Sequence, residues 1–305
     1  CKGTFCTLAG SHTFEPVRME VTLFPNPRRP GIGQRPKREA QRPMLPQHSR
    51  LCPVLEAGNS LGALVYPPLA KNEQLQIGYE GEGVYHLSYA INATGARWDS
   101  LFTVTYRLAV GGIGLRTEDV KLFVPETPGF KDTAKVMARM FIVPDDIGTP
   151  AGAVTLRGAF NFQTPPGWDT VYSSVLNQIE RPIAPMLVIR VETDWYPHDS
   201  EFRYVLAPGE TMSVSHSLPI GQVFFVPREE ISFRDGTEQE AAARLAASKQ
   251  FFDEKARHKS KTPYGLDYSP HYQRQSRAQK AAAPAALAAD SEGRPEPDES
   301  TGPTG

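Results

Sequence analysis

Hydrophobic and polar residues alternate along much of the middle of the chain. The clearest run is Phe102, Val104, Tyr106, Leu108 and Val110, with Thr, Thr, Arg and Ala between them. A period of two puts successive side chains on opposite faces of a strand, so we expect antiparallel strands that each bury one face. The same pattern predicts strands at residues 75–79, 85–91, 154–162, 186–191, 202–206, 211–215 and 222–226.

Glycine and proline predict where these strands bend or turn. Gly158 lies inside the run 154–162 and predicts a β-bulge there. The sequence Ala207-Pro208-Gly209-Glu210 suits a type II turn, because Pro favours its second position and Gly tolerates the positive φ of its third. This turn predicts a hairpin from Phe202 to Ser215.

Two segments have the spacing of a helix instead. Lys131–Phe141 fits either a short helix or a long strand, since Val136, Met137, Met140 and Phe141 recur at helical spacing between strand-like flanks. Thr237 and Glu240 form a capping box ahead of an alanine-rich run. We therefore expect a helix from about Thr237 to Arg257.

The fold class that follows is mainly β: an antiparallel barrel, sandwich or β-clip-like core with one C-terminal α-helix and a disordered tail. Residues 25–53 are rich in proline and basic residues and predict a solvated loop or extended arm. We expect a non-native or disordered leader at 1–18, because Met19 opens an alternating run, and the core with its helix at 19–256. A basic extension at 257–280 and a disordered acidic tail at 281–305 complete the expected organisation.

Composition limits the functional classes. The 305 residues are 40% hydrophobic, enough for a sizeable core, and the net charge of -1 provides no field that would favour nucleic acid. The chain has neither a membrane-length apolar run nor a signal sequence, so we expect a cytoplasmic protein without membrane contact. The 3 cysteines match no zinc or disulfide pattern. Dinucleotide and P-loop motifs are absent, and we expect no cofactor.

Residues suited to a functional site concentrate between Thr164 and Val226. The candidate ligand-binding side chains are Trp168, Ser173, Ser174, Trp195, His198 and Gln222, and the candidate catalytic carboxylates are Glu192 and Asp194. Carboxylates accept hydrogen bonds and an aromatic face stacks, so such a cluster fits a sugar, a base or a metal. The alternative is a strand-to-loop transition in which Asp residues cap turns and Trp195 fills the core.

Histidine positions give little support for a metal centre. His198 and His216 with Asp194 or Asp199 have the residue types of a two-histidine, one-carboxylate iron site, but no HxH, HxD or HExxH motif occurs. We therefore predict no metal. We expect Ser173 and Ser174 to be hydrogen-bonding strand residues.

A succession of short motifs resembles one protein family. The motifs are Pro165-Pro166-Gly167-Trp168, Ile183-Ala184-Pro185, Val191–Trp195, Pro208-Gly209, Leu218–Pro227 and His271-Tyr272, with Cys52-Pro53 and Asn59–Gly62 before them. Together they look like the bacterial family known only as domain of unknown function number 6065, over about residues 19–274. The resemblance implies a β-rich core and no particular activity.

A second resemblance concerns the trimeric dUTPases and dCTP deaminases, which have a β-clip fold. Pro166-Gly167-Trp168, Ser173-Ser174, Val191–Trp195 and Gly221–Phe224 follow the order of their motifs, although Tyr172 stands where an Arg is expected. The resemblance implies that Glu192 orients water or a ribose hydroxyl, that Trp195 stacks on the sugar and that Ser174 holds phosphate.

Three functions therefore stay open on sequence grounds. The first is a binding or accessory protein, monomeric or homo-oligomeric, whose pocket around Trp168 and Trp195 holds a small polar ligand. The second is a nucleotide hydrolase of the dUTPase type that uses Glu192. The third is an interaction module whose basic segment 257–280 docks a partner protein.

Overall fold

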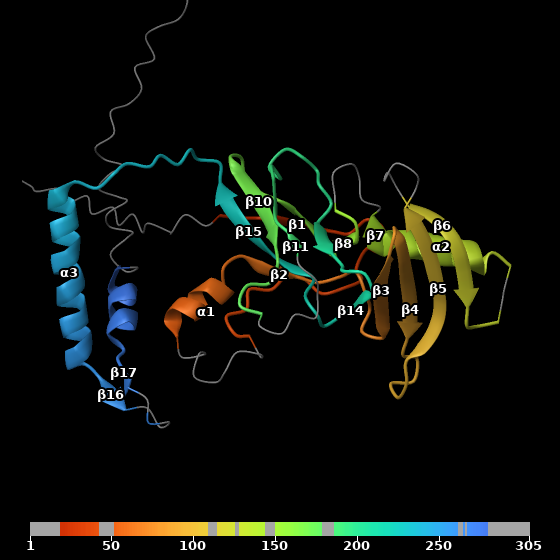
Figure 1. Ribbon diagram of the computed structural model, residues 1–305, viewed down its shortest axis with the longest axis horizontal. Helices are drawn as coiled ribbons and strands as arrows, with labels where there is room; N and C mark the ends of the chain where they lie inside the picture. Colours follow the sequence, from red (N-terminus) through yellow and green to blue (C-terminus); the bar gives the residue numbers. More distant parts are fainter. Residues whose placement is uncertain are drawn as a thin grey trace, which may run out of the picture. The chain divides into compact units, whose positions relative to one another are not determined.

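A computed structural model describes residues 19–42, 52–108, 115–125, 128–143, 150–178, 186–261, 265 and 267–279. The chain divides into two compact units, Glu20–Glu230 and a smaller one that includes Ile231–Gly305 (Figure 1). The first unit contains most of the strands, and the helix predicted near Thr237 lies in the second. The expected leader at 1–18 and acidic tail at 281–305 lie outside the described residues.

The largest sheet of the first unit has five antiparallel strands. Their spatial order is β14 (Glu210–Ser215), β3 (Glu73–Gly81), β4 (Val84–Ile91), β5 (Asp99–Leu108) and β6 (Leu115–Leu122). On β5, Phe102, Val104 and Tyr106 are at most 3% exposed, whereas Thr103 and Thr105 face the other side and are only half-buried. The alternating sequence pattern therefore predicted both the strands and their buried face.

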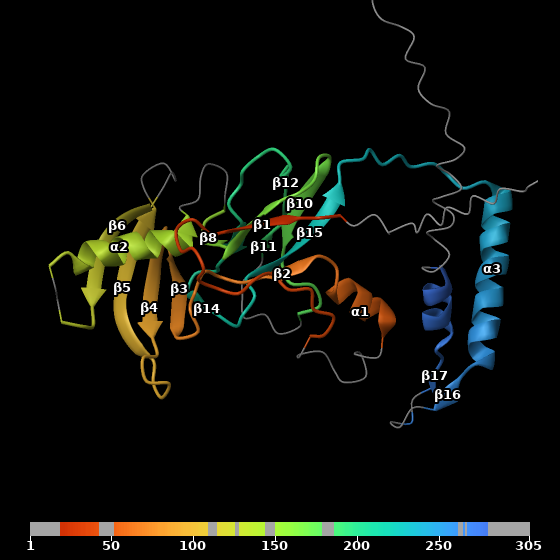
Figure 2. The same ribbon diagram turned by 180° about the vertical axis from the view of Figure 1, so that it is seen from behind.

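Helix α2 (Phe130–Phe141) covers one face of this sheet (Figure 2). Ala134 and Ala138, one helical turn apart, are fully buried, and Met137 and Met140 pack beside them. Two alanines on one stripe let the helix approach the strands closely. The segment that the sequence left open between helix and strand is thus a helix.

Three further sheets complete the first unit, and all of their pairings are antiparallel. One has the order β12 (Ile189–Val191), β10 (Trp168–Ser173), β15 (Gly221–Pro227), β2 (Ala63–Val65). Another has the order β11 (Met186–Leu187), β13 (Glu201–Val205), β8 (Ala153–Arg157), β7 (Ile142–Val143), and the third pairs β1 (Thr22–Pro25) with β9 (Phe160–Gln163). The mainly β prediction is confirmed, and within the described residues each sheet is open, as in a sandwich.

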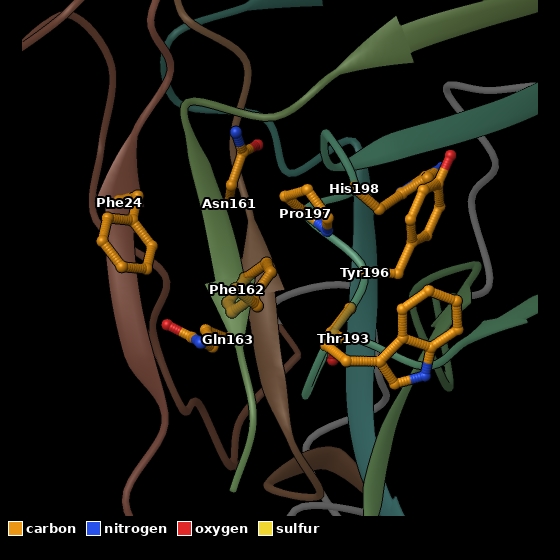
Figure 3. A pocket seen from close by; sticks show the side chains of 9 residues that line it. Phe24, Asn161, Phe162, Gln163, Thr193, Tyr196, Pro197 and His198 are labelled. Carbon is orange, nitrogen blue, oxygen red and sulfur yellow. The ribbon is translucent and has the colours of Figure 1, made fainter. Parts of the chain in front are cut away.

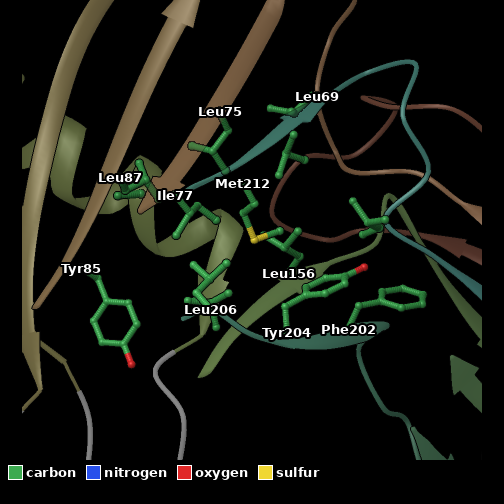
Figure 4. Packing of buried hydrophobic residues seen from close by; sticks show 14 of the residues in the cluster. Leu69, Leu75, Ile77, Tyr85, Leu87, Leu156, Phe202, Tyr204, Leu206 and Met212 are labelled. Atoms are coloured by element: carbon green, nitrogen blue, oxygen red, sulfur yellow. The ribbon is translucent and has the colours of Figure 1, made fainter. Parts of the chain in front are cut away.

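A continuous hydrophobic core joins these sheets (Figure 4). Side chains of β3 and β4, including Ile77 and Leu87, face side chains of β8 and β13, including Leu156 and Phe202. All four are at most 2% exposed. Burying a side chain of this size stabilises the fold by about 1.5–3 kcal/mol.

The predicted hairpin from Phe202 to Ser215 is wrong, although its turn is correct. Gly209 has φ of 80°, and the amide of Glu210 donates to the carbonyl of Ala207 at 2.9 Å, as a type II turn requires. The flanking strands then part, since β13 pairs with β8 and β11 while β14 pairs with β3. The turn carries the chain from one sheet to another.

The predicted β-bulge at Gly158 is also wrong, because Gly158 lies between two separate strands. Strands β8 and β9 belong to different sheets, and the Gly158 amide donates to the carbonyl of Ser200 at 2.8 Å. A Cβ atom at this position would lie 2.9 Å from the Val65 side chain and 3.0 Å from Ser200 Cβ. The close approach of three chain segments therefore requires glycine.

The described part of the proline-rich arm, residues 26–42, contains only an isolated bridge between Lys37 and Leu64. Arg42, 4% exposed, fixes its end by donating to backbone carbonyls, among them those of Asn59 at 2.9 Å and Leu176 at 3.1 Å. After residues outside the described set comes a helix that the sequence analysis missed, α1 (Pro53–Asn59).

The second unit is mainly helical where it is described. Helix α3 (Glu238–Arg257) begins at the predicted capping box, in which Thr237 accepts from the Glu240 amide. A hydrogen bond from Arg234 and further ones from Thr237 lower the pKa of Glu240 to about 2. Strands β16 (Ser260–Lys261) and β17 (Asp267–Tyr268) pair, and residues 271–279 are also helical, so the chain has more helices than the single one predicted. Of the helices described, none is long and apolar enough to cross a membrane.

Candidate functional site

An aromatic groove lies between strand β9 and the loop that follows β12. Strand β9 alternates: Phe162 points into the core at 4% exposure, and Asn161 and Gln163 point the other way. Strand β1 pairs with β9 and brings Phe24 opposite Asn161. The loop from Glu192 to Ser200 faces β9 and forms the second wall.

Buried hydroxyl groups fix the first end of this loop. The Thr193 hydroxyl lies 2.9 Å from that of Thr164 and 2.7 Å from that of Thr170, and all three residues are at most 4% exposed. The Thr164 amide also donates to the Thr193 carbonyl at 3.4 Å. Buried hydroxyls that are mutually bonded hold the loop in one position against β9 and β10.

An amide and a carboxylate fix the other end of the loop. Asn161 donates to Asp199 Oδ1 at 3.0 Å and accepts from the Ser200 amide at 2.9 Å. Arg157 and Arg28 both pair with Asp199 Oδ2, the latter at 2.9 Å. The carboxylate is therefore neutralised, and the groove between the two anchors has defined walls.

The groove has a volume of about 290 Å³. Its lining residues are Phe24, Asn161, Phe162, Gln163, Thr193, Trp195, Tyr196, Pro197 and His198. Figure 3 shows Phe24 and the β9 residues on one side and Pro197, Tyr196 and His198 on the other. Trp195 is 68% exposed, and Tyr196 and Phe24 are each 48% exposed. Every lining side chain is aromatic, apolar, amide, hydroxyl or imidazole, and none is a carboxylate, an ammonium or a guanidinium.

Trp195 is held in its exposed position by a hydrogen bond. Its indole N–H donates to Glu192 Oε2 at 2.5 Å, and this bond favours one orientation of a ring whose surface is mostly exposed to water. The Trp195 and Tyr196 ring centroids lie 5.8 Å apart with 47° between the planes. The two rings form a bent aromatic surface along the groove.

A cluster of charges supports the loop from behind. Arg228, directly after β15, donates to Asp194 Oδ1 at 2.7 Å and to Asp169, and lies 3.8 Å from Glu192. Arg190 on β12 donates to Asp169 Oδ2 at 2.6 Å. Burial alone raises the pKa of Asp169, but the hydrogen bonds from the two arginines outweigh burial and leave it below the ordinary 3.8. The hydrogen bonds from Arg228 and from the Gly167 amide likewise lower the pKa of Asp194.

The surroundings of His198 favour the uncharged imidazole. Burial lowers the pKa of its imidazole, Asp199 opposes that effect, and Arg203 and Arg157 add to it. Its Nδ1 atom is buried and has no hydrogen-bond partner, and its ring packs 5.9 Å from Tyr172 and 5.6 Å from Tyr196. An N–H at the buried Nδ1 would be unpaired, which favours the neutral tautomer with its proton on Nε2.

The structure brings only two of the eight predicted site residues, Trp195 and His198, into the lining of the groove. Glu192 and Asp194 lie in the same loop but are bonded to Trp195 and Arg228 respectively. Trp168 opens β10, and its carbonyl accepts from the Thr164 hydroxyl at 2.6 Å.

The remaining predicted residues lie on or next to β10 and β15. Ser173 is buried and is the register partner of Gln222, and Ser174 is exposed after the end of β10. Gln222 is fully buried, and its amide accepts from the Leu176 amide and donates to the Leu61 carbonyl. Its hydrogen-bonding capacity is used inside the protein, so it holds β15 to neighbouring loops.

Phe24, Asn161 and Gln163 are groove residues that sequence reasoning missed. The run Phe160–Gln163 does alternate aromatic and amide side chains, which is a signal for a strand with a polar exposed face. Nothing local indicated that this face meets the loop after β12, because that proximity comes from long-range pairing.

The pentapeptide Gly58–Gly62 matches the G-x-S-x-G pattern of serine hydrolases but has a different context. The hydrolase motif connects a strand to a helix, whereas Ser60 here follows helix α1 and precedes β2. Its hydroxyl donates to the carbonyl of Glu56 at 3.0 Å or of Ala57 at 3.1 Å. Ser60 therefore closes the end of α1.

Comparisons of the chain with protein-family models, with curated proteins and with solved structures found no match. Among the described residues, no group of three or more His, Cys, Asp or Glu side chains could hold a metal ion.

Proposed function

We propose that the protein binds a small polar ligand in the groove at Trp195. The observation that carries the proposal is the indole itself, which is 68% exposed yet held by a hydrogen bond to Glu192. Leaving a large aromatic ring in water forgoes the stabilisation that burial would give, and a fixed ring loses little entropy when a ligand covers it. An exposed aromatic surface that is oriented by a hydrogen bond and lies beside polar groups fits a binding role.

The size and lining of the groove support a small ligand. Its volume of about 290 Å³ is at the lower end of the range for ligand pockets. Gln163 is exposed on β9 and offers both an amide donor and a carbonyl acceptor. An apolar wall with few polar groups is the usual composition of such a site.

Nucleotide hydrolysis, the alternative drawn from the dUTPase resemblance, has less support. Asp194 accepts from Arg228 and from the Gly167 amide, and Glu192 accepts from Trp195, so both carboxylates already have partners. A nucleotide phosphate also needs cations or clustered amides, and the groove lining supplies no cation. Docking of a partner by residues 257–280, and membership of the family of unknown function, stay predictions.

Thermal unfolding tests the proposal with a matched pair of variants. Neutral sugars, nucleosides, nucleotides and amino acids are added to wild type, to Trp195→Ala and to Trp98→Ala, which removes an indole that is 42% exposed outside the groove. A ligand at ten times its Kd stabilises by about 1.4 kcal/mol, which raises Tm by about 3–6 °C for a domain of this size.

We expect at least one compound to raise the Tm of wild type and Trp98→Ala and to leave that of Trp195→Ala unchanged. A shift that survives the loss of Trp195, or no shift with any compound, would show that the groove is not a binding site for these ligands.

A further inference from the structure

The groove combines aromatic surface with a complete lack of charge. Its nine lining residues include no Asp, Glu, Lys or Arg, and burial lowers the pKa of His198 and so disfavours its charged form. The carboxylates beside the groove each have a cation nearby: Asp199 pairs with Arg157, Asp194 with Arg228, and Glu192, which accepts from the Trp195 indole, lies 3.8 Å from Arg228. A charged ligand would lose hydration here without finding a counter-ion, so the site favours an uncharged ligand.

We infer that the ligand is an uncharged pyranose, either a free hexose or one residue of a neutral oligosaccharide. This inference rests on the proposed function, since it names the class of ligand that the groove at Trp195 takes. Ring geometry, hydrogen-bonding groups and size each support it.

The angle between the rings favours a sugar over a planar base. The ring planes of Trp195 and Tyr196 are inclined at 47°, so the two rings meet at an angle and do not form two parallel walls. A planar base gains most from a ring face parallel to it. A pyranose chair is puckered, and its apolar C–H groups can contact one ring while an edge of the same sugar contacts the other.

The polar groups of the groove match hydroxyl groups, which both donate and accept. Gln163 supplies a donor and an acceptor, and the neutral imidazole of His198 supplies an N–H at Nε2. The side-chain amide of Asn161 has two N–H groups, and only one of them is used in the hydrogen bond to Asp199. The Thr193 hydroxyl is shared between two buried threonines and is not available.

The expected affinity is modest, because one sugar ring fills the groove. A hexose has about a dozen non-hydrogen atoms, which at ordinary ligand efficiency gives a Kd on the order of 1 mM. Binding at this level is measurable by titration of tryptophan fluorescence, since covering the exposed indole changes its emission.

The experiment titrates the full chain with the methyl pyranosides of glucose, galactose, mannose and N-acetylglucosamine, and with uridine, uridine monophosphate and glucuronate. We expect at least one pyranoside to bind with a Kd near 1 mM. Trp195→Ala should weaken that binding at least about 10-fold, and Trp98→Ala should leave it unchanged. Glucuronate should bind more weakly than methyl glucoside, because its carboxylate has no counter-ion in the groove.

A second pair of variants tests the polar contacts. Gln163→Ala should weaken pyranoside binding, whereas Gln76→Ala, on the solvent face of β3 where Gln76 bonds to Ser213, should not. Both side chains are on the surface, so both variants are expected to fold, which circular dichroism checks.

The possible outcomes separate the inference from the proposed function. Trp195-dependent binding of uridine or its monophosphate, with no pyranoside bound, overturns the sugar inference and leaves the groove as a binding site. Absence of Trp195-dependent binding by every probe overturns both. A pyranoside that binds equally well to Trp195→Ala overturns the placement of the sugar on the indole.

Discussion

Replacing Asp169 by Asn tests the charge cluster that supports the groove. The Asp169 side chain is 3% exposed and accepts from Arg190 Nε at 2.6 Å and from Arg228 Nε at 2.9 Å. Arg190 extends from β12 and Arg228 follows β15, the two strands that flank β10 in its sheet. One carboxylate therefore ties three neighbouring strands together, and Asn keeps its shape while removing its charge.

The expected loss is about 2–3 kcal/mol of unfolding free energy. Removing one partner of a buried ion pair costs about 3–5 kcal/mol when the other charge stays buried. Here Arg190 and Arg228 are 49% and 35% exposed and regain hydration, which reduces the cost. At about 2–4 °C per kcal/mol, the corresponding fall in Tm is about 4–12 °C.

The assay is urea unfolding of the full chain, followed by tryptophan fluorescence, to which Trp168 beside Asp169 contributes together with Trp98 and Trp195. The control is Asp99→Asn, because Asp99 pairs with Arg97 on the surface, where the side chains are 42% and 82% exposed. Such an exposed pair is worth about 0.2–1 kcal/mol. If Asp169→Asn is no more destabilising than Asp99→Asn, the cluster does not stabilise the sheet as argued.

Acid unfolding gives the same carboxylate a second test. The pKa of Asp169 is lowered in the folded protein, so the unfolded chain binds a proton at higher pH than the folded one. The contribution of Asp169 to stability is complete above the ordinary value of 3.8 and is lost as pH falls through the lower folded value. The gap between wild type and Asp169→Asn should therefore close in that acid range.

Two further predictions concern Glu73 and His198. Glu73→Gln should cost about 3–5 kcal/mol in urea unfolding, because it leaves the half-buried Arg29 without its bidentate partner. The double variant with Arg29→Met should be less destabilised than Glu73→Gln alone, and an equal or larger loss would contradict this account. Because burial lowers the pKa of His198, the free energy of unfolding should fall as pH drops below the ordinary 6.5. That fall should be smaller in His198→Gln, and an identical pH profile would refute the assignment.

Local sequence signals predicted local structure well. The alternation of Phe102, Val104 and Tyr106 gave the strand and its buried face, because an antiparallel sheet with one solvent face imposes a period of two. The capping box at Thr237 and Glu240 marked the start of α3, since both hydrogen bonds form within one turn. In each case the residues that produce the sequence signal and the element that they form lie within a few positions of one another.

Pairing between distant segments was not predictable in the same way. The turn at Pro208-Gly209 has the expected geometry, yet the strand before it pairs with β8 and the strand after it with β3. Turn residues determine how the chain reverses direction, but they do not determine which strands the two flanking segments pair with. Gly158 shows the same limit, because its need for glycine comes from contacts with Val65 and Ser200.

The groove depends on this long-range pairing, so its sequence prediction was only partial. Trp195 and His198 belong to one loop and were identified together, whereas Phe24 and Gln163 join them only because β1 pairs with β9. The predicted carboxylates are near the site for a different reason. Glu192 orients the indole, and Asp194 neutralises Arg228.

Charged residues support the loop that carries Trp195, and uncharged residues line the groove. Arg228 connects Asp169 on β10 with Asp194 and Glu192 in the loop, and Glu192 in turn holds Trp195. Every charge in this chain of contacts has an opposite charge beside it, and none lines the groove. A charged side chain therefore orients the indole, whereas the residues that line the groove carry no charge. On the proposal of an uncharged pyranose ligand, selection would rest on shape and hydroxyl pattern, because the groove lining has no charge with which to attract an ion.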